Sequence, residues 1–349
     1  MRSPARTFTI AAAAVAALAA TITPAVASDH GSASPGNGRS TTQDIAVIGD
    51  APYGTAALGA FPRLIDQINT DPTVSDVVHI GDIKSGSSDC SDAYFARIKS
   101  LFDTFRDPLQ YTTGDNEWTD CHNSGHVPTE RLAKLRQVFF PSPGTTLGQD
   151  PMKVTAQPGL PEDVSWSQNR VTFGTFDVQG SNNDLVAWDP VTPPAGDGPG
   201  PEWAARSPKV VDWLNRTFDA AEQQHSAGVA LFLQADMWSD ENLANGQGGS
   251  GYAPFVQQLA ERAKEFGRPV VLINGDSHVY AERHPLDGTH YTTVKAPNLT
   301  QITIQRSLEP PTPDTVGQPV AAEWLDLHID PRSSAVFSWT RKPSILASN

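Results

Sequence analysis

The chain has 349 residues, of which 38% are hydrophobic, and a formal net charge of −14 at pH 7. This length is enough for one large or two modest domains with a well-buried core. The acidic balance argues against nonspecific binding to nucleic acid or to an anionic membrane, because their phosphates would repel the protein surface.

Residues 1–27 have the pattern of a secretory signal peptide. Arg2 and Arg6 precede an apolar run, IAAAAVAALAATI, and the small-residue triplet AVA at 25–27 is typical of a cleavage site. The alternative, a membrane span, would need a longer apolar run. Residues 28–43 are poor in large apolar side chains and predict a flexible tether. We therefore expect a secreted protein that is free of the membrane after cleavage.

Apolar runs and helix-like segments alternate from residue 44 onward. Strands are predicted at 44–49, 76–81, 108–114, 170–180, 228–236 and 269–276, and helices at 59–71, 91–105, 128–140, 208–224 and 252–266. Such β-α-β units predict an α/β protein with a parallel sheet and crossover helices. Three short β segments between 300 and 340 then favour a mixed sheet. We expect one domain over 44–342, a surface loop at 189–203 and a tail at 343–349.

Aspartates end most of the predicted strands. Four of them follow a glycine directly, at Asp50, Asp82, Asp115 and Asp276, and Asp236 ends a fifth run. Because ligands bind at the carboxyl ends of parallel strands, these side chains should meet at one crevice. A single Gly-Asp pair is an ordinary turn, but converging carboxylates repel one another unless a cation offsets their charge. The pattern therefore predicts divalent metal ions.

A histidine and a pair of cysteines add to this pattern. His278 follows Asp276 by two residues, and an imidazole among carboxylates makes Zn, Fe or Mn possible beside Mg, Mn or Ca. Cys90 and Cys121 are the chain's only cysteines. Outside the cell such a pair is most simply a disulfide, and the alternative is two unrelated thiols.

In their order and spacing, the segments GDAP, GDIKSG, GDNE, LQAD and GDSH resemble the motifs of the calcineurin-like metallophosphoesterases, a superfamily that includes the purple acid phosphatases. The resemblance covers residues 44–300. It implies a two-sheet αββα sandwich, with mixed sheets flanked by helices. It also implies two divalent metal ions and, as nucleophile, a metal-bound water that attacks phosphorus.

The motifs assign roles to individual residues by this resemblance. One ion would be held by Asp50, Asp82 and His278, and the other by Asp82, Asp115, Asp276 and Gln234. Asp82 would then bridge the two ions. Asn116 stands where the family has the histidine that assists catalysis, so we name Asn116, Asp82 and His122 as the catalytic candidates. His122 would be a histidine that swings in, and His126 is the alternative for that role.

The sequence also departs from the family at the second ion. One motif histidine is replaced there by Gln234 or Asp236 and another by Asp276, which shifts the preference from Zn or Fe toward Mg, Mn or Ca. We predict a monomeric, secreted phosphoesterase that acts on a small phosphorylated substrate. The alternative is a metal-binding protein on the same fold that has lost catalysis and binds an anionic ligand.

Overall fold

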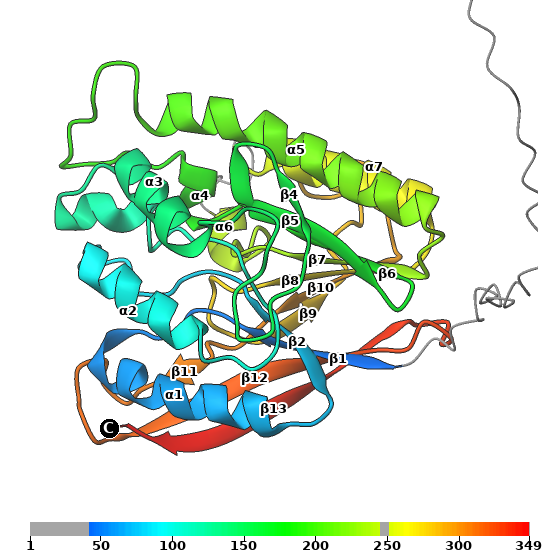
Figure 1. The fold of residues 1–349 in the computed structure, drawn as a ribbon. Coiled ribbons are helices and arrows are strands. Elements are labelled where there is room, and N and C mark those ends of the chain that lie inside the picture. The colour runs from blue at the N-terminus through cyan, green and yellow to red at the C-terminus, as the bar shows by residue number, and fades with distance from the viewer. Residues whose placement is uncertain (1–41, 245–250, 349) are drawn as a thin grey trace, which may run out of the picture. The chain divides into compact units, whose positions relative to one another are not determined.

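The computed structural model describes residues 42–244 and 251–348. The predicted signal peptide and nearly all of the predicted tether lie outside these described residues. Within them, no helix combines the length and the apolar character needed to cross a bilayer. The strands form two sheets, which lie between helices (Figure 1).

The first sheet has six strands in the order β11-β12-β1-β2-β3, with β13 also paired to β12. Strands β1, β2 and β3 run parallel, whereas β12 is antiparallel to β1. Their bounds are β1 Gln43–Ile48, β2 Val74–His79, β3 Leu109–Tyr111, β11 Leu308–Glu309, β12 Pro319–Ile329 and β13 Phe337–Ala347.

The second sheet has seven strands in the order β4-β5-β6-β7-β8-β10-β9. Strands β6, β7, β8 and β10 run parallel, and β5 and β9 pair antiparallel at either side. Their bounds are β4 Thr155–Gln157, β5 Leu160–Gln168, β6 Val171–Thr175, β7 Gly228–Phe232, β8 Val270–Asn274, β9 Ala281–Arg283 and β10 Leu299–Thr303. Both sheets are therefore mixed, as the family resemblance implied.

Three hydrophobic clusters define the layers of the fold. Val47 and Val78 of the first sheet share a cluster with Phe173, Phe232 and Ile273 of the second, so the two sheets pack face to face. The outer faces are covered by helices. Their bounds are α1 Gly54–Thr70, α2 Asp92–Phe102, η1 Thr119–Ser124 (a 3-10 helix), α3 Pro128–Phe139, α4 Gly180–Asp184, α5 Pro199–Gln223, α6 Asp240–Ala244 and α7 Ala253–Phe266.

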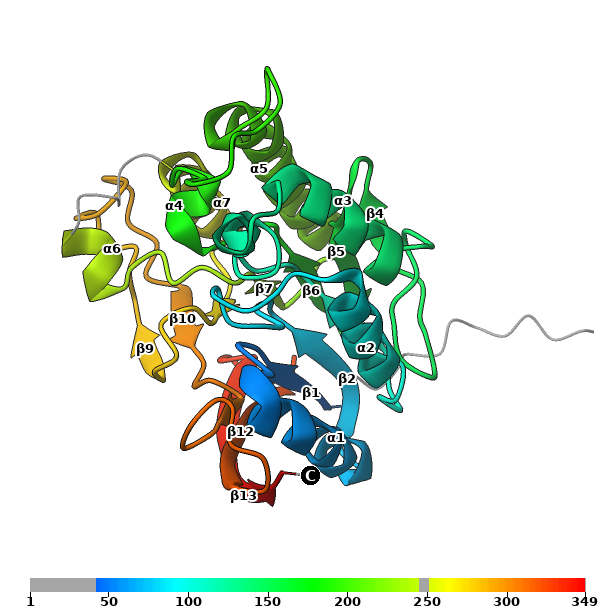
Figure 2. The ribbon, with the colours of Figure 1, turned by 90° about the vertical axis from the view of Figure 1, so that its left-hand side faces the viewer.

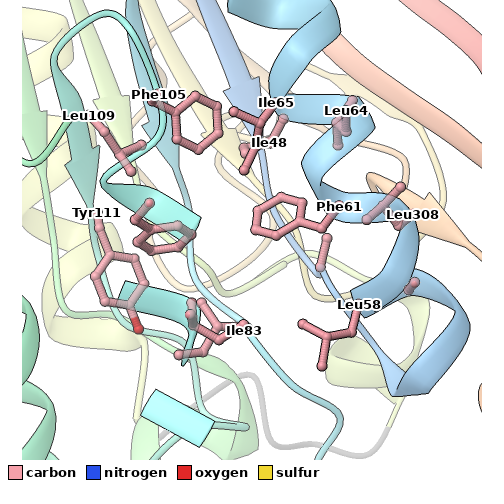
Figure 3. Close-up of a cluster of buried hydrophobic side chains, with 14 of the residues drawn as sticks. Ile48, Leu58, Phe61, Leu64, Ile65, Ile83, Phe105, Leu109, Tyr111 and Leu308 are labelled. Atoms are coloured by element: carbon pink, nitrogen blue, oxygen red, sulfur yellow. The ribbon is translucent and has the colours of Figure 1, made fainter. Parts of the chain in front are cut away.

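Helices α1, α2 and α3 cover the first sheet, and α5 and α7 cover the second. Figure 2 shows α1 and α2 beside β1 and β2. Figure 3 shows Phe61 and Ile65 of α1 in the same buried cluster as Ile48 of β1 and Leu109 of β3. This order of layers is the predicted αββα sandwich, and it brings the carboxyl ends of parallel strands from both sheets to one edge.

The structure differs from the sequence predictions at several places. The elements that were not predicted are the strands β4, β5, β9 and β11 and the short helices η1, α4 and α6. Helix α5 begins at Pro199, inside the segment that we expected to be a surface loop, and proline is well suited to the first turn of a helix. Strand β13 extends to Ala347, so the expected tail from 343 is wrong. Pro343 is tolerated in β13 because this strand pairs only with β12 among the described strands.

Candidate metal centre

Three ligand-type side chains from both sheets converge at the shared edge. Asp50 follows β1 and Asp82 follows β2 in the first sheet, and His278 follows β8 in the second. One oxygen or nitrogen atom from each lies within 4.8 Å of the others. We call Asp50, Asp82 and His278 the metal triad. The prediction placed these three residues together from the ends of their strands, and the fold brings them together.

The backbone turns sharply at each of these residues. Asp50, Asp82 and His278 have φ angles of 51°, 60° and 62°, and Asp276 has 73°. This is the left-handed region, which L-residues other than asparagine and aspartate seldom adopt. Each strand therefore ends in a left-handed residue whose side chain lies at the crevice.

The metal triad suits a cation. Among the described residues, the buried Oδ2 of Asp50 has no hydrogen-bond donor. The glycines of the motifs make the close approach possible, since a Cβ at Gly275 would lie 2.3 Å from that oxygen and a Cβ at Gly114 would lie 2.1 Å from Asp82 Oδ1. A buried carboxylate oxygen without a donor is costly. A divalent cation bound by two carboxylates and an imidazole would satisfy it.

A second group of carboxylates surrounds Gln234, which follows β7. We call Asp82, Asp115 and Asp276 the second carboxylate set. The Nε2 atom of Gln234 lies 3.3 Å from Asp82 Oδ2, 3.2 Å from Asp115 Oδ1 and 3.1 Å from Asp276 Oδ1. The other end of this amide, Oε1, accepts a hydrogen bond from the backbone N–H of Gly180. The fold thus brings all four predicted residues together, with the amide nitrogen at their centre.

The predicted catalytic residues occupy different surroundings. Asn116 lies in the site, where its Nδ2 donates to Asp82 Oδ2 at 2.6 Å and to the Tyr53 hydroxyl at 2.7 Å. Tyr53 donates to the same Asp82 oxygen at 2.7 Å. His122 lies in η1, where its Nδ1 is 2.7 Å from the carbonyl oxygen of Thr119. Its role in catalysis therefore stays a prediction that would require its side chain to move.

Burial and mutual repulsion shift the acidity of the site. Burial is the main cause that raises the pKa of Asp82 and Asp115, and neighbouring carboxylates add to it. The pKa of Asp276 rises to about 7, again mainly through burial and then through the charge of Asp50. Without a cation these carboxyl groups hold their protons more strongly than ordinary aspartates, so cation binding would favour proton release.

Glu117 holds the two ligand loops of the first sheet together. Its Oε1 accepts from the backbone N–H of Asp82 at 3.1 Å and of Gly114 at 2.7 Å, and from the Tyr111 hydroxyl at 2.8 Å. Its Oε2 accepts from the N–H of Ile83 at 3.3 Å. This role was not predicted from the sequence, although the acid at the end of GDNE belongs to the resembled motif.

Arg306 contacts the metal triad and was also missed. It lies on the connection between β10 and β11, and its Nη2 is 2.7 Å from His278 Nδ1. Its guanidinium lies over the ring of Tyr53, 4.7 Å from the ring centroid, and pairs with Glu309 at 3.0 Å. No sequence motif marks this arginine, because it reaches the site only through the path of the chain from one sheet to the other.

A cavity of about 640 Å³ opens beside the second carboxylate set. Asp115 and Asp276 line it together with Arg283, and the exposed side chains of Val186 and Val279 add apolar surface. A larger hollow of about 850 Å³ lies at α7 and residues 288–294, and none of the strand-end carboxylates lines it. The chemistry of the lining residues therefore favours the smaller cavity as the binding site.

The predicted disulfide is present. Cys90 and Cys121 are joined, with their Cα atoms 5.8 Å apart. Cys90 lies between the Asp82 loop and α2, and Cys121 lies in η1, a few residues after Asp115. The bond therefore connects the segments that follow two of the candidate ligands.

Comparison with known proteins identifies the fold. No family model and no curated protein matches the sequence. Among solved structures, PhoD is similar with a TM-score of 0.50 and 11% identity, over 88% of this chain and 68% of that chain. Weaker matches include the purple acid phosphatase PPD1 from yellow lupin seeds, at 0.43 and 10% identity, and a Mycoplasma pneumoniae phosphatase, at 0.41 and 9%.

The extent of these weaker matches differs. This chain covers 53% of the lupin chain, about half of its length, and 95% of the Mycoplasma chain, with 86% and 88% of its own residues matched. Three observations decide the fold: the match to PhoD, the two mixed sheets and the candidate ligand residues at their shared edge. Together they give this chain the fold of the calcineurin-like metallophosphoesterases.

Proposed function

We propose that this protein is a secreted, metal-dependent phosphoesterase that hydrolyses small phosphorylated substrates. The observation that carries the proposal is the metal triad, where Asp50, Asp82 and His278 converge and the buried Oδ2 of Asp50 has no donor within the described ranges 42–244 and 251–348. The N-terminal signal pattern and the disulfide support secretion. The net charge of −14 favours a small substrate over nucleic acid.

The residues of the chain suggest how the site works. Asp50, Asp82 and His278 would hold a divalent cation, which when bound supplies Lewis-acid polarisation of a phosphoryl oxygen and an acidified water. The two N–H groups of Asn116 donate to Asp82 and Tyr53, and by exchanging the bond to Tyr53 the amide can donate to a phosphate oxygen. The cavity beside Asp115 and Asp276 gives room for the leaving group. The carboxylate-rich ligands favour Mg or Mn, and the imidazole also admits Zn or Fe.

An activity matrix of metals and substrates tests this proposal. The full-length protein is assayed with Mg, Mn, Ca, Zn and Fe on phosphate mono- and diesters, and Asp82→Asn is assayed in parallel. We expect activity with at least one metal and its loss in Asp82→Asn. The matched control is Asp66→Asn, because Asp66 is an exposed carboxylate on α1 that belongs neither to the metal triad nor to the second carboxylate set. Activity that survives Asp82→Asn would refute the mechanism.

The identity of the leaving group gives a second test. Asn116 cannot protonate a leaving alkoxide, and lost general-acid help typically costs about 10²- to 10⁴-fold in rate. We therefore expect nitrophenyl phosphate to be hydrolysed much faster than an alkyl phosphate. If His122 swings in, His122→Gln should widen this gap. Equal rates on both substrates, unchanged in His122→Gln, would contradict the expectation.

The second candidate function is binding of an anionic ligand without turnover. It is favoured by the local hydrogen bond of His122, which holds that ring to Thr119, and by the amide at Asn116. The same matrix separates the two functions. Inorganic phosphate that binds with metal present, while every ester stays intact, would favour the binding protein.

A further inference from the structure

We propose that each chain binds one metal ion, at the metal triad, and that the side-chain amide of Gln234 occupies the second position. The inference rests on the proposed metal-dependent function. It departs from the two ions that the family resemblance implies, and its basis is the orientation of one buried amide.

The orientation of Gln234 follows from its neighbours. The backbone N–H of Gly180 can only donate, so the atom of Gln234 that it contacts must be the oxygen Oε1. The NH₂ group therefore faces the second carboxylate set, with its nitrogen 3.1–3.3 Å from one oxygen of each member. A nitrogen that carries two protons cannot act as a metal ligand.

The amide nitrogen also competes with a cation for the same three oxygens. It lies 3.1–3.3 Å from them as a hydrogen-bond donor, whereas Mg or Ca would need them at about 2.0–2.6 Å and would have to displace these contacts. Moving Gln234 aside would break its bond to Gly180 and would leave buried polar groups unpaired, because Gln234 is fully buried.

The remaining oxygens of this set already have neutral donors. Asp115 Oδ2 accepts from the Ser181 hydroxyl at 2.9 Å. Asp276 Oδ2 accepts from the backbone N–H of Asp236 at 3.1 Å. Asp50 of the metal triad is different, since its Oδ2 has no donor among the described residues. Asp82 belongs to both halves of the site, and its oxygens accept from Tyr53 and Asn116. The two halves therefore differ at Asp50, which adds an oxygen open to a cation to the metal triad alone.

Metal stoichiometry tests this inference with four forms of the full-length protein. Mn²⁺ is titrated calorimetrically into the wild type, Asp50→Asn, Gln234→Glu and Gln301→Glu. Glutamate at 234 keeps the shape but replaces the donor with a ligand oxygen. Gln301 is the matched control, because it is also a buried amide that donates to an aspartate, Asp236 at 3.0 Å.

We expect one Mn²⁺ equivalent in the wild type and in Gln301→Glu, none in Asp50→Asn, and two in Gln234→Glu. Two equivalents bound by the wild type, or a spin-coupled Mn pair in its electron paramagnetic resonance spectrum, would overturn the inference even if a variant fails to fold. A folded Gln234→Glu that binds one equivalent would overturn the role of Gln234. A wild type that binds no metal would overturn the proposed function together with this inference.

Discussion

Replacing Glu117 with glutamine should weaken metal binding without changing any ligand. Its Oε1 accepts three hydrogen bonds, and Oε2 accepts one from the N–H of Ile83. In the variant an NH₂ group would face that N–H, which loses one bond to a charged acceptor. This costs about 1–3 kcal/mol of unfolding free energy. Loss of such a supporting partner typically weakens metal affinity about 10- to 100-fold.

The assay compares Mn²⁺ affinity by calorimetry with unfolding free energy by urea denaturation. Glu162→Gln is the matched control, because Glu162 is equally buried but pairs with Arg136 of α3 rather than with a ligand loop. Both variants should lose stability, and only Glu117→Gln should lose metal affinity. Equal metal affinity in Glu117→Gln and the wild type would refute the reasoning, as would an equal loss of affinity in both variants.

Three further predictions concern other parts of the molecule. Arg306→Met should tighten Mn²⁺ binding about 5- to 10-fold, because the guanidinium no longer contacts a nitrogen of the His278 imidazole. The control Arg341→Met removes a similar arginine, stacked on Tyr280, and should leave Mn²⁺ binding unchanged. Weaker Mn²⁺ binding by Arg306→Met in calorimetry would contradict this prediction. Burial raises the pKa of Asp76 from 3.8 to about 7, so the folded protein keeps a proton that the unfolded chain releases. The contribution of Asp76 to the unfolding free energy is complete below about pH 4 and falls by at most about 4 kcal/mol as the pH rises to 7. Asp76→Asn should therefore reduce the difference in unfolding free energy between pH 5 and pH 8, measured by urea denaturation. An unchanged difference would refute this prediction. Replacing both Cys90 and Cys121 with serine should lower the unfolding free energy by about 2–4 kcal/mol, because the disulfide joins residues with a sequence separation of 31. A urea unfolding midpoint equal to that of the wild type would count against this prediction.

The strand-end motifs carried the sequence prediction of the site. A Gly-Asp pair after a buried strand can be recognised from the local sequence alone. Because the carboxyl ends of parallel strands lie at one edge of a sheet, such pairs are predicted to lie together without any knowledge of contacts. Asp50 and Asp82 met His278 for this reason. The disulfide was predictable because two cysteines allow only one pairing.

What the sequence did not predict depends on contacts between distant segments. Strand β5 contains Pro161 and the acids Glu162 and Asp163, which argue against a buried strand. Glu162 is nevertheless buried because Arg136 of α3 pairs with it. The orientation of the Gln234 amide was hidden for the same reason, since it depends on a backbone N–H 54 residues away. Residue type alone suggests a possible ligand oxygen there, whereas the fold presents the nitrogen.

The geometry of this site lowers the stability of the protein, because the backbone is left-handed at Asp50, Asp82, Asp276 and His278. A non-glycine residue in this region costs on the order of 1 kcal/mol or more, which glycine would not incur. A chain that no longer used the site could therefore become more stable by exchanging these residues for glycine. The same geometry limits alanine scanning here, because alanine would remove a ligand and keep the backbone strain. Asparagine, which tolerates left-handed angles, separates the loss of ligation from the loss of folding.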